Sequence, residues 1–277
     1  MTSIANPNQA EYWNGDAGSA WVKHQERLDA VLTPFTEASL LAMGKIKGLR
    51  VLDVGCGCGE SSEMLAERQA DVTGLDISAP MIARANDRRA KGGSVQFVCG
   101  DAATFQDNAG FDRMYSRFGC MFFENPVASF AHLRQLLRKG GSAKLMCWQS
   151  PRDNPWMAIA GRAIAPFLPD QPPRDPRAPG PFAFADQDYV TSILAQAGFT
   201  EIHFDSVQRS VLMAPSVEEA IAFQMDIGPA ARSLRSMDES TRAEALAAIH
   251  GALEPYLTDA GVEMLGAVWL ILSLIHI

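Results

Sequence analysis

A glycine-rich segment near the N-terminal third of the chain has the composition of a ligand-binding loop. The aliphatic run 51–54, which contains Asp53, leads directly into the alternating glycines Gly55, Gly57 and Gly59. Glycines let a backbone approach a ligand closely, and a helix starting after them presents unpaired N–H groups. A carboxylate or a phosphate would be stabilised at this position. An ordinary tight turn has the same appearance, so the neighbouring segments must decide between the two interpretations.

Two further aspartates follow predicted strands and strengthen the ligand-binding interpretation. Asp76 ends the second predicted strand, 21 residues beyond Gly55, where a carboxylate can accept both hydroxyl groups of a ribose. Asp101 follows the third strand within Gly100-Asp101-Ala102. In an open parallel sheet the ligand crevice lies at the carboxyl ends of the strands, so the loop and both aspartates are expected to converge. Each aspartate alone would be equally compatible with a helix N-cap.

The elements that must position these residues alternate between short β-branched runs and longer helical patterns, which is typical of a parallel sheet covered by helices. Strands are predicted over 49–54, 71–76, 95–99, 111–115, 142–148, 201–212 and 267–272, and helices over 60–69, 78–90, 126–137, 186–197, from 216 onward and 239–257. We therefore predict an α/β fold with a doubly wound, Rossmann-like sheet of about seven strands. It should be mostly parallel, with an antiparallel last strand and helical lid insertions.

A single domain spanning 1–277 is expected, divided into segments with different tasks. They are an N-terminal helical lid (1–48), a cofactor-binding core (49–148), a proline-rich acceptor cap (149–185) and a completion of the sheet (186–277) with a helical insertion (214–260). An amphipathic pattern over 18–32 predicts one lid helix. The prolines between 151 and 181 predict a stretch without regular core structure. The apolar end, 273–277, is expected to be frayed.

The motifs resemble those of the class I S-adenosylmethionine-dependent methyltransferases, specifically the small-molecule group related to quinone-biosynthesis methyltransferases. The resemblance runs from Leu49 to about Trp148 and rests on segments 51–59, 74–78, 100–102, 111–116 and 136–141. It implies S-adenosylmethionine as cofactor, S-adenosylhomocysteine as product, and methyl transfer to a small-molecule acceptor by in-line displacement at the sulfonium. One departure is Glu60, because many relatives carry a neutral residue there and an inward-facing acid would repel the cofactor carboxylate.

The resemblance also implies roles for individual residues. Cofactor contacts are expected from Asp53, Gly55, Cys56, Gly57, Asp76, Ile77, Met81, Asp101, Ala102, Ser116 and Arg117, and acceptor contacts from Trp13, Trp21, Phe118, Met121 and Phe122. Within the first set, Asp76 would hold the ribose, and Ile77 and Met81 would flank adenine. Asp101 would accept from the exocyclic amine. No catalytic residue is identified; His24, on the expected lid helix, is the candidate base to test. For each aromatic, plain core packing remains the alternative.

Two other functions remain open from the sequence. A nicotinamide-dependent Rossmann oxidoreductase also needs a glycine turn and a later acid, but its G-x-G-x-x-G pattern requires glycine where Glu60 stands. A non-catalytic protein that binds S-adenosylmethionine would carry the same loop. The identity of the acceptor, and whether oxygen, nitrogen, carbon or sulfur is methylated, cannot be read from these residues.

The overall charge restricts the class of partner. The 277 residues carry a formal net charge of -8 and are 47% hydrophobic, which disfavours nucleic acid and anionic membranes and favours a small molecule. Five scattered cysteines and unpaired histidines give no metal-binding spacing, so no metal is expected. The polar N-terminal residues have no signal-peptide pattern, which predicts a cytoplasmic protein. The sequence does not indicate an oligomeric state.

Overall fold

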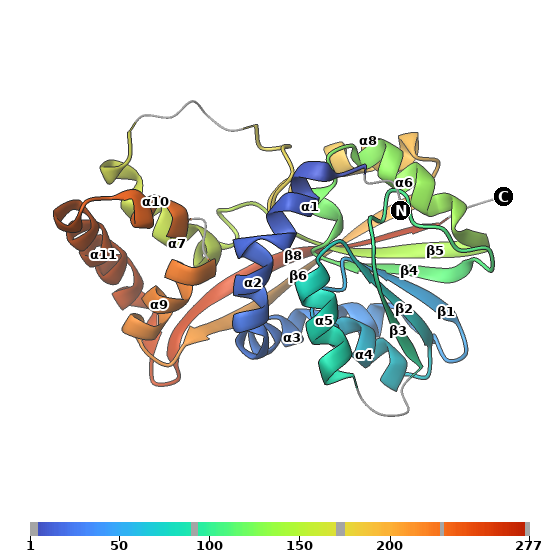
Figure 1. Ribbon diagram of the computed structural model, residues 1–277, viewed down its shortest axis with the longest axis horizontal. Coiled ribbons are helices and arrows are strands. Elements are labelled where there is room, and N and C mark those ends of the chain that lie inside the picture. The colour runs from blue at the N-terminus through green and yellow to red at the C-terminus, as the bar shows by residue number, and fades with distance from the viewer. Residues whose placement is uncertain (1–4, 90–93, 170–174, 228–229, 275–277) are drawn as a thin grey trace. The chain divides into compact units, whose positions relative to one another are not determined.

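The computed structural model describes residues 5–89, 94–169, 175–227 and 230–274 and is built around one mixed sheet (Figure 1). The strands are β1 (Arg50–Val54), β2 (Asp71–Asp76), β3 (Val95–Cys99), β4 (Phe111–Arg117), β5 (Leu137–Trp148), β6 (Thr200–Ala214), β7 (Leu257–Thr258) and β8 (Gly261–Leu274). Their order is β3-β2-β1-β4-β5-β8-β6, with β7 paired to β8. The predicted fold class is confirmed.

Helices precede, connect and follow these strands. They are α1 (Pro7–Asn14), α2 (Asp16–Lys23), α3 (Gln25–Ala42), α4 (Glu60–Glu67), α5 (Ala79–Arg88), α6 (Pro126–Gln135), α7 (Pro155–Ile164), α8 (Gln187–Gln196), α9 (Val217–Ile227), α10 (Ala231–Ser236) and α11 (Glu239–Leu253). Short 3₁₀ turns cover Cys120–Phe122, Ala165–Phe167 and Glu254–Tyr256. Among the described residues, none of these helices is long and apolar enough to cross a bilayer.

The strand order places a topological switch point between β1 and β4. From β1 the chain builds outward to β2 and β3, then returns to pair β4 in parallel with the other side of β1. Because connections leave β1 and β4 in opposite directions, a ligand crevice is expected at their carboxyl ends. The glycine loop follows β1 and residues 118–123 follow β4, so both segments begin at this crevice.

The last strand is longer than expected. β8 pairs antiparallel with β5 from Val268 opposite Trp148 to Leu274 opposite Ser142. Ser273 is completely buried. The expectation that the chain is frayed from 273 is therefore wrong for Ser273 and Leu274, because both are paired with β5. Residues 275–277 lie outside the described part.

Three local expectations also need correction. The helix expected to close at 139–141 ends at Gln135, because Leu137 already pairs with Phe111 and starts β5. In place of the single lid helix expected over 18–32, the structure has two helices, α2 and α3, which are divided at His24. Helix α2 contacts α5, whereas α3 has its own buried residues between Gln25 and Leu40. The proline-rich stretch contains α7, whose proline stands at the first helical position and therefore does not interrupt the helix.

The coordinates group into two compact units. Unit 1 comprises 1–149, 176–207 and 268–277, and unit 2 comprises 150–175 and 208–267. Every residue implied in cofactor binding belongs to unit 1. Unit 2 consists of α7, α9, α10 and α11 with the adjoining parts of β6 and β8. The sequence expectation of a single folding domain stays a prediction.

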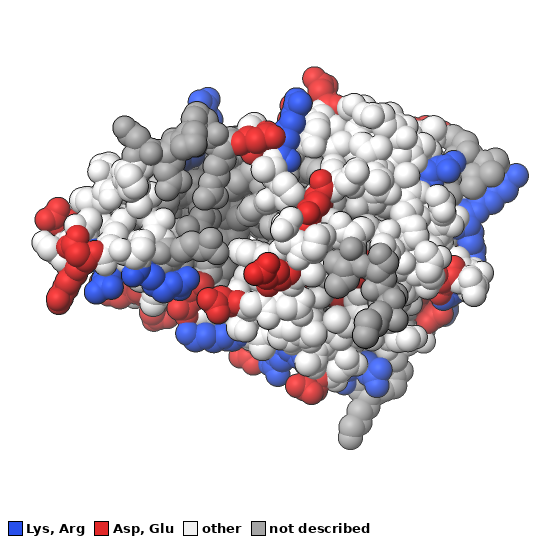
Figure 2. Space-filling model, turned by 45° about the horizontal axis from the view of Figure 1, so that its top comes forward, with Lys and Arg blue, Asp and Glu red and all other residues white. Residues whose placement is uncertain are grey.

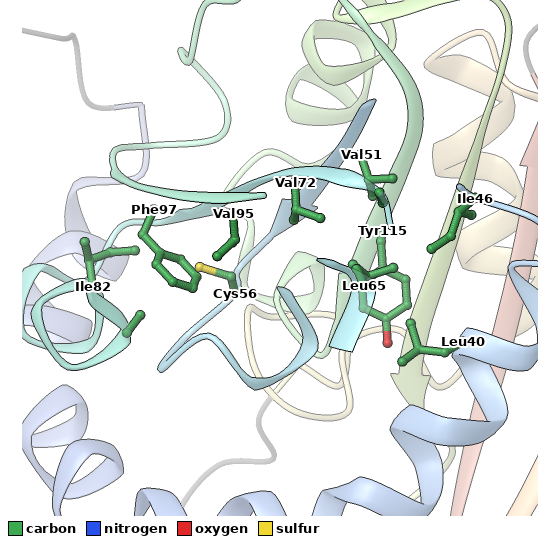
Figure 3. Close-up of a cluster of buried hydrophobic side chains, with 12 residues drawn as sticks. Leu40, Ile46, Val51, Cys56, Leu65, Val72, Ile82, Val95, Phe97 and Tyr115 are labelled. Carbon is green, nitrogen blue, oxygen red and sulfur yellow. The ribbon is translucent and has the colours of Figure 1, made fainter. Parts of the chain in front are cut away.

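A hydrophobic cluster lies beneath the glycine loop in unit 1 (Figure 3). Its members come from α3, α4, α5, the first four strands and the loops between them: Leu40, Ile46, Val51, Cys56, Leu65, Ala70, Val72, Ile82, Ala85, Val95, Phe97 and Tyr115. Tyr115 is wholly buried, and its hydroxyl shares a 2.6 Å hydrogen bond with Ser39 of α3. The helix that precedes β1 is therefore part of the core and not only a cover.

Candidate cofactor site

The glycine loop has a backbone conformation that only glycine adopts easily. Gly55, Gly57 and Gly59 have φ values of 72°, 56° and 90°, all in the left-handed region. The backbone N–H groups of Gly55 and Cys56 donate to the carbonyl of Leu75, at 2.8 and 3.2 Å. These bonds join the end of β1 to the end of β2. The loop is therefore fixed before any ligand arrives.

One position of this loop is open and the others are packed. A Cβ added to Gly57 would meet only the sulfur of Met81, at 3.7 Å, among the described residues. A Cβ on Gly59 would come within 2.6 Å of the Phe97 ring. Gly59 thus fits the loop against the core, whereas Gly57 leaves room for a ligand to lie on the backbone beside Met81.

Asp53 has one carboxylate oxygen without a partner. Its Oδ2 accepts hydrogen bonds from the Ser61 and Ser62 hydroxyls, both at 2.7 Å. Its Oδ1 is buried and has no hydrogen-bond partner among the described residues. Burial raises the pKa of this carboxyl, and the two serine hydroxyls oppose that rise. An unpaired buried acceptor at the end of β1 is suited to a cationic donor such as an ammonium group.

Asp76 is placed to support the loop and to bind a ligand. Its Oδ2 accepts from the Gly57 N–H and its Oδ1 from the Ser78 N–H, both at 2.8 Å. Each oxygen retains a second lone-pair direction. Burial raises the pKa of Asp76 to about 6, despite these hydrogen bonds. Ser78 also caps α5 as expected, with its hydroxyl accepting from Met81 N.

Glu60 is neutralised by an arginine. It forms a buried ion pair with Arg117, the last residue of β4, and its Oε1 accepts from the Thr33 hydroxyl at 2.7 Å. Arg117 also donates to the Thr36 hydroxyl at 2.7 Å. The inward-facing acid therefore has its counter-ion in place, which removes the objection that it would repel a bound carboxylate. Arg117 itself is engaged with α3 and α4.

Ser116 lies near the end of β4, and Ala102 lies in the turn that follows β3. The Ser116 hydroxyl donates to the Val54 carbonyl at 2.7 Å, which ties β4 to the start of the glycine loop. Ala102 is buried directly after Asp101. Ile77 is partly exposed, and its carbonyl accepts from Asn14 at 3.0 Å. The structure thus brings the predicted residues of the β1, β2 and β4 ends together through hydrogen bonds to backbone groups.

Asp101 is occupied by the chain itself. Its Oδ2 accepts from the N–H groups of Ala5 and Asn6, both at 2.8 Å. Its Oδ1 accepts from Asn6 Nδ2 at 2.8 Å and from the Ala103 N–H at 2.9 Å. A carboxylate has about four lone-pair directions, and these four donors use them. The role implied for Asp101 toward adenine remains untested.

The aromatic residues predicted to contact the acceptor form two groups. Trp13 makes edge-to-face contacts with Tyr12, Trp21 and Phe122, with ring centroids 5.0, 5.9 and 5.1 Å apart. Phe118 stacks on Trp148 at 4.0 Å and adopts a left-handed φ of 62°. Trp13, Trp21 and Phe122 are partly exposed, whereas Phe118 and Met121 are buried. Core packing thus accounts for Phe118 and Met121, and the first group can still face a ligand.

The remaining candidates are explained differently. His24 separates α2 from α3 and lines a hollow with Gln25 and Arg84. Its role as a base stays a prediction. The Cys56 thiol lies in the core cluster, and burial raises its pKa well above the ordinary value, so it is a poor nucleophile. Within the described residues there is no group of three or more potential metal ligands.

Sequence reasoning missed several residues that shape the site. Ser61 and Ser62 could have been found, because they stand in the first turn of the helix that follows the loop. Thr33 and Thr36 gave no signal beyond a helical pattern. Asn6 and Glu124 gave none at all, although the Asn6 side chain accepts from the Glu124 N–H at 2.9 Å.

Comparison with known proteins agrees with this geometry. A family model described as "Methyltransferase domain" matches residues 51–141, the segment from β1 into β5. A demethylmenaquinone methyltransferase of Renibacterium salmoninarum is 28% identical over 173 residues, 59% of this chain and 71% of that protein. One of Beutenbergia cavernae is 34% identical over 133 residues, 47% of this chain and 54% of that protein. The match therefore spans about half the length of the second relative.

A solved structure shares the fold. Magnesium protoporphyrin IX methyltransferase from Synechocystis, crystallised with S-adenosylhomocysteine, superposes with a TM-score of 0.54 at 21% identity, covering 76% of this chain and 94% of that one. At this identity the likeness concerns the fold alone. The family match spans the glycine loop, Asp76 and Asp101. Residues 51–141 therefore match a methyltransferase domain, and the chain is similar to S-adenosylmethionine-dependent methyltransferases, among them two enzymes named demethylmenaquinone methyltransferases.

Proposed function

We propose that the chain transfers the methyl group of S-adenosylmethionine to a small, partly apolar acceptor. The observation that carries the proposal is the unpaired Oδ1 of Asp53, a buried carboxylate oxygen on the strand that leads into the glycine loop, where Gly57 leaves space for a ligand. A buried acceptor without a donor is costly, so its retention is explained by a ligand that supplies the donor. The ammonium group of the methionine portion is such a donor.

The other parts of the cofactor fit residues at the same strand ends. Gly55, Cys56 and Gly57 would cradle the methionine portion with their backbone, and Asp76 would accept the ribose hydroxyls on its remaining lone pairs. Ile77 and Met81 would lie on either side of adenine. The N–H group of Ala102 would be available to an adenine ring nitrogen. Nothing in this set requires a movement of the core strands.

The residues of this chain would contribute mainly by positioning. Bound S-adenosylmethionine supplies an electrophilic methyl group on a sulfonium, which reacts with a nucleophile approaching in line. Holding the acceptor in that line, with water excluded, can provide most of the rate gain. The aromatic faces of Trp13 and Phe122 are suited to a flat acceptor and to the positive charge of the sulfonium. A base is needed only if the acceptor must lose a proton.

A quinol-like acceptor is the first class to examine, because two of the relatives are named demethylmenaquinone methyltransferases. The acidic net charge supports a small molecule over nucleic acid. Figure 2 shows Lys and Arg side chains interspersed with Asp and Glu on the face in view, with wide uncharged areas between them. Such a surface offers little to a polyanion.

Binding and turnover test the proposal separately. Calorimetry with S-adenosylhomocysteine should show micromolar binding, and the nicotinamide dinucleotides should not compete. Incubation with labelled S-adenosylmethionine and a panel of quinols, phenols, amines and thiols should then give a methylated product. Absence of cofactor binding would overturn the proposal. Binding without transfer to any acceptor in the panel would favour the non-catalytic alternative.

A further inference from the structure

The first described residues of the chain are hydrogen-bonded, at both ends of the segment, to residues that border the candidate cofactor site. We define residues 5–14 as the strap. At one end Asp101 holds Ala5 and Asn6, while Glu124 accepts from Asn8 N at 2.8 Å, Asn8 Nδ2 at 2.9 Å and Gln9 N at 3.2 Å. Two carboxylates thus receive backbone and side-chain donors from four residues, Ala5, Asn6, Asn8 and Gln9.

At its other end the strap is bonded beside Asp76. Asn14 donates to the Ile77 carbonyl at 3.0 Å and accepts from the Ala79 N–H at 2.9 Å. The Ser78 hydroxyl donates to the Trp13 carbonyl at 2.7 Å. Figure 1 shows α1, which makes up most of the strap, and α2 at the start of the chain. The strap therefore joins the carboxyl ends of β2 and β3 to the loop after β4.

These contacts involve the residues that would surround adenine and ribose. Ile77 and Asp101 are both candidate cofactor residues, and both are engaged by the strap. The Asp101 carboxylate has no lone-pair direction left for an adenine amine while Ala5 and Asn6 are seated. A closed strap and an Asp101 contact to adenine are consequently incompatible.

We propose that Asp101 is a positioning residue that latches the strap over the cofactor site, and that the strap must be released before cofactor or product can exchange. This inference rests on the proposed function, because it takes the covered site to be the cofactor site. Asp101 then acts through Asn6 and does not read adenine directly. Glu124 is the second anchor of the same latch.

Because of the latch, we expect variants of the strap to change the association and dissociation rates of S-adenosylhomocysteine more than its equilibrium affinity. Opening exposes the site in both directions, so weakening the latch accelerates both entry and escape of S-adenosylhomocysteine. Asn6→Ala removes one donor to Asp101 and the acceptor of the Glu124 N–H. We expect it to raise the dissociation rate of S-adenosylhomocysteine by about tenfold, the effect of losing a hydrogen bond to a charged group. Glu124→Gln should act in the same direction.

The matched control is Glu11→Gln, which removes a charge from the same helix at an exposed position. It should leave both rates unchanged. Amide hydrogen exchange of the free protein gives a readout independent of the cofactor: Asn6→Ala and Glu124→Gln should increase exchange in residues 7–14, while peptides from β1, β2 and β4 stay protected. Exchange spreading through those strands would mean that the variants unfold the protein, and Asp101→Asn then serves as the milder variant.

A double-mutant cycle separates the latch from direct recognition of adenine. If Asp101 acts through the strap, Asp101→Ala should raise the dissociation rate by a smaller factor when Asn6→Ala is already present, because both changes weaken the same latch. A full additional loss of affinity in the double variant would overturn the proposal and assign Asp101 to adenine. The wild-type protein could fail to bind S-adenosylhomocysteine while Asn6→Ala and Glu124→Gln still increase amide hydrogen exchange in the strap. In that case the proposed function would be wrong and the latch would still stand.

Discussion

Gly119 and Gly55 touch through their backbones, and this contact fixes the distance between the loop after β4 and the glycine loop after β1. A Cβ built on Gly55 would lie 2.6 Å from Gly119 Cα, and one built on Gly119 would lie 2.8 Å from Gly55 Cα. Gly119 has an ordinary φ of -85°, so its need for glycine is steric and not conformational. The two loops at the switch point therefore approach each other at backbone distance, which leaves no space for a side chain at either glycine.

Gly119→Ala tests this contact directly. The added methyl group would also meet the Val54 carbonyl at 2.7 Å, and backbone atoms cannot move aside as a side chain can. We expect a loss of about 1 to 3 kcal/mol in the free energy of unfolding, the usual cost of overpacking, together with weaker cofactor binding. Denaturant unfolding and calorimetry measure the two effects. Gly251→Ala is the control, because a Cβ there meets nothing within 4 Å and the residue lies in α11. A Gly119 variant as stable as this control would contradict the steric account.

The central sheet and its glycine loop could be predicted because their signals are local. β-branched runs alternate with helical runs, and the glycines stand directly between a strand and a helix. The same reasoning placed α8 between Asp186 and Gly198, which the structure has as N-cap and as a left-handed residue with a φ of 88°. Each of these features is decided within about ten residues of sequence.

The contacts that could not be predicted are those between distant segments. Asn6 and Asp101 are 95 positions apart, and no property of either residue announces the pairing. The ion pair between Glu60 and Arg117 could not be predicted either, because Arg117 is 57 positions away in the sequence and ends a strand. The α7 helix was missed for a different reason: proline content was taken to exclude a helix, although a proline at the first position is compatible with one.

A second prediction concerns pH. Burial raises the pKa of Asp76 to about 6 from an ordinary 3.8, and ribose hydroxyls favour its ionised form. Affinity for S-adenosylhomocysteine should therefore fall as the pH drops through about 6 and stay constant above about 7. Because the folded-state pKa is raised, this group's contribution to stability has the opposite sign: it falls as pH rises from about 4 to about 6.

Calorimetric titration between pH 5 and 8 measures the effect, with Asp76→Asn as the comparison. The variant should bind more weakly at neutral pH and should lack the part of the pH dependence that is centred near 6. Thermal unfolding at each pH shows whether the fold is retained. An unchanged affinity profile in the variant would rule out Asp76 as the titrating ribose acceptor.

The buried pair of Glu60 and Arg117 gives a third prediction. Their side chains are only 10% and 9% exposed, so removing one partner leaves a charge in the interior. Glu60→Gln should lower the free energy of unfolding by about 3 kcal/mol, near the low end of the cost of breaking such a pair. The double variant Glu60→Gln with Arg117→Met should lose less than the two single losses added together.

The exposed residue Glu26 supplies the control for this pair. It lies 3.9 Å from Arg84 with 91% of its side chain exposed, and Glu26→Gln should change stability by less than about 0.5 kcal/mol. Strictly additive losses at Glu60 and Arg117 in denaturant unfolding would show that the two charges do not depend on each other.

The last prediction concerns how much of the N-terminal region is cover and how much is core. The lid expected over residues 1–48 includes buried side chains, because Leu28, Val31 and Leu32 are all at most 5% exposed. Farther along α3, Phe35 is fully buried and contacts Trp148, with ring centroids 5.4 Å apart. By contrast, none of the residues of α1 is buried.

Two truncations should therefore behave differently. Removing residues through Asn14 deletes the strap and should leave a cooperatively folded protein that binds S-adenosylhomocysteine with faster exchange. Removing residues through Leu32 also deletes three buried aliphatic side chains, and losing the burial of each costs about 2 kcal/mol or more, which is comparable to the whole stability of many domains. Circular dichroism and thermal unfolding of both proteins measure the difference. Equal stability of the two truncated proteins would show that the part of α3 up to Leu32 belongs to the lid. Failure of the protein without the strap to fold would show that α1 is part of the core.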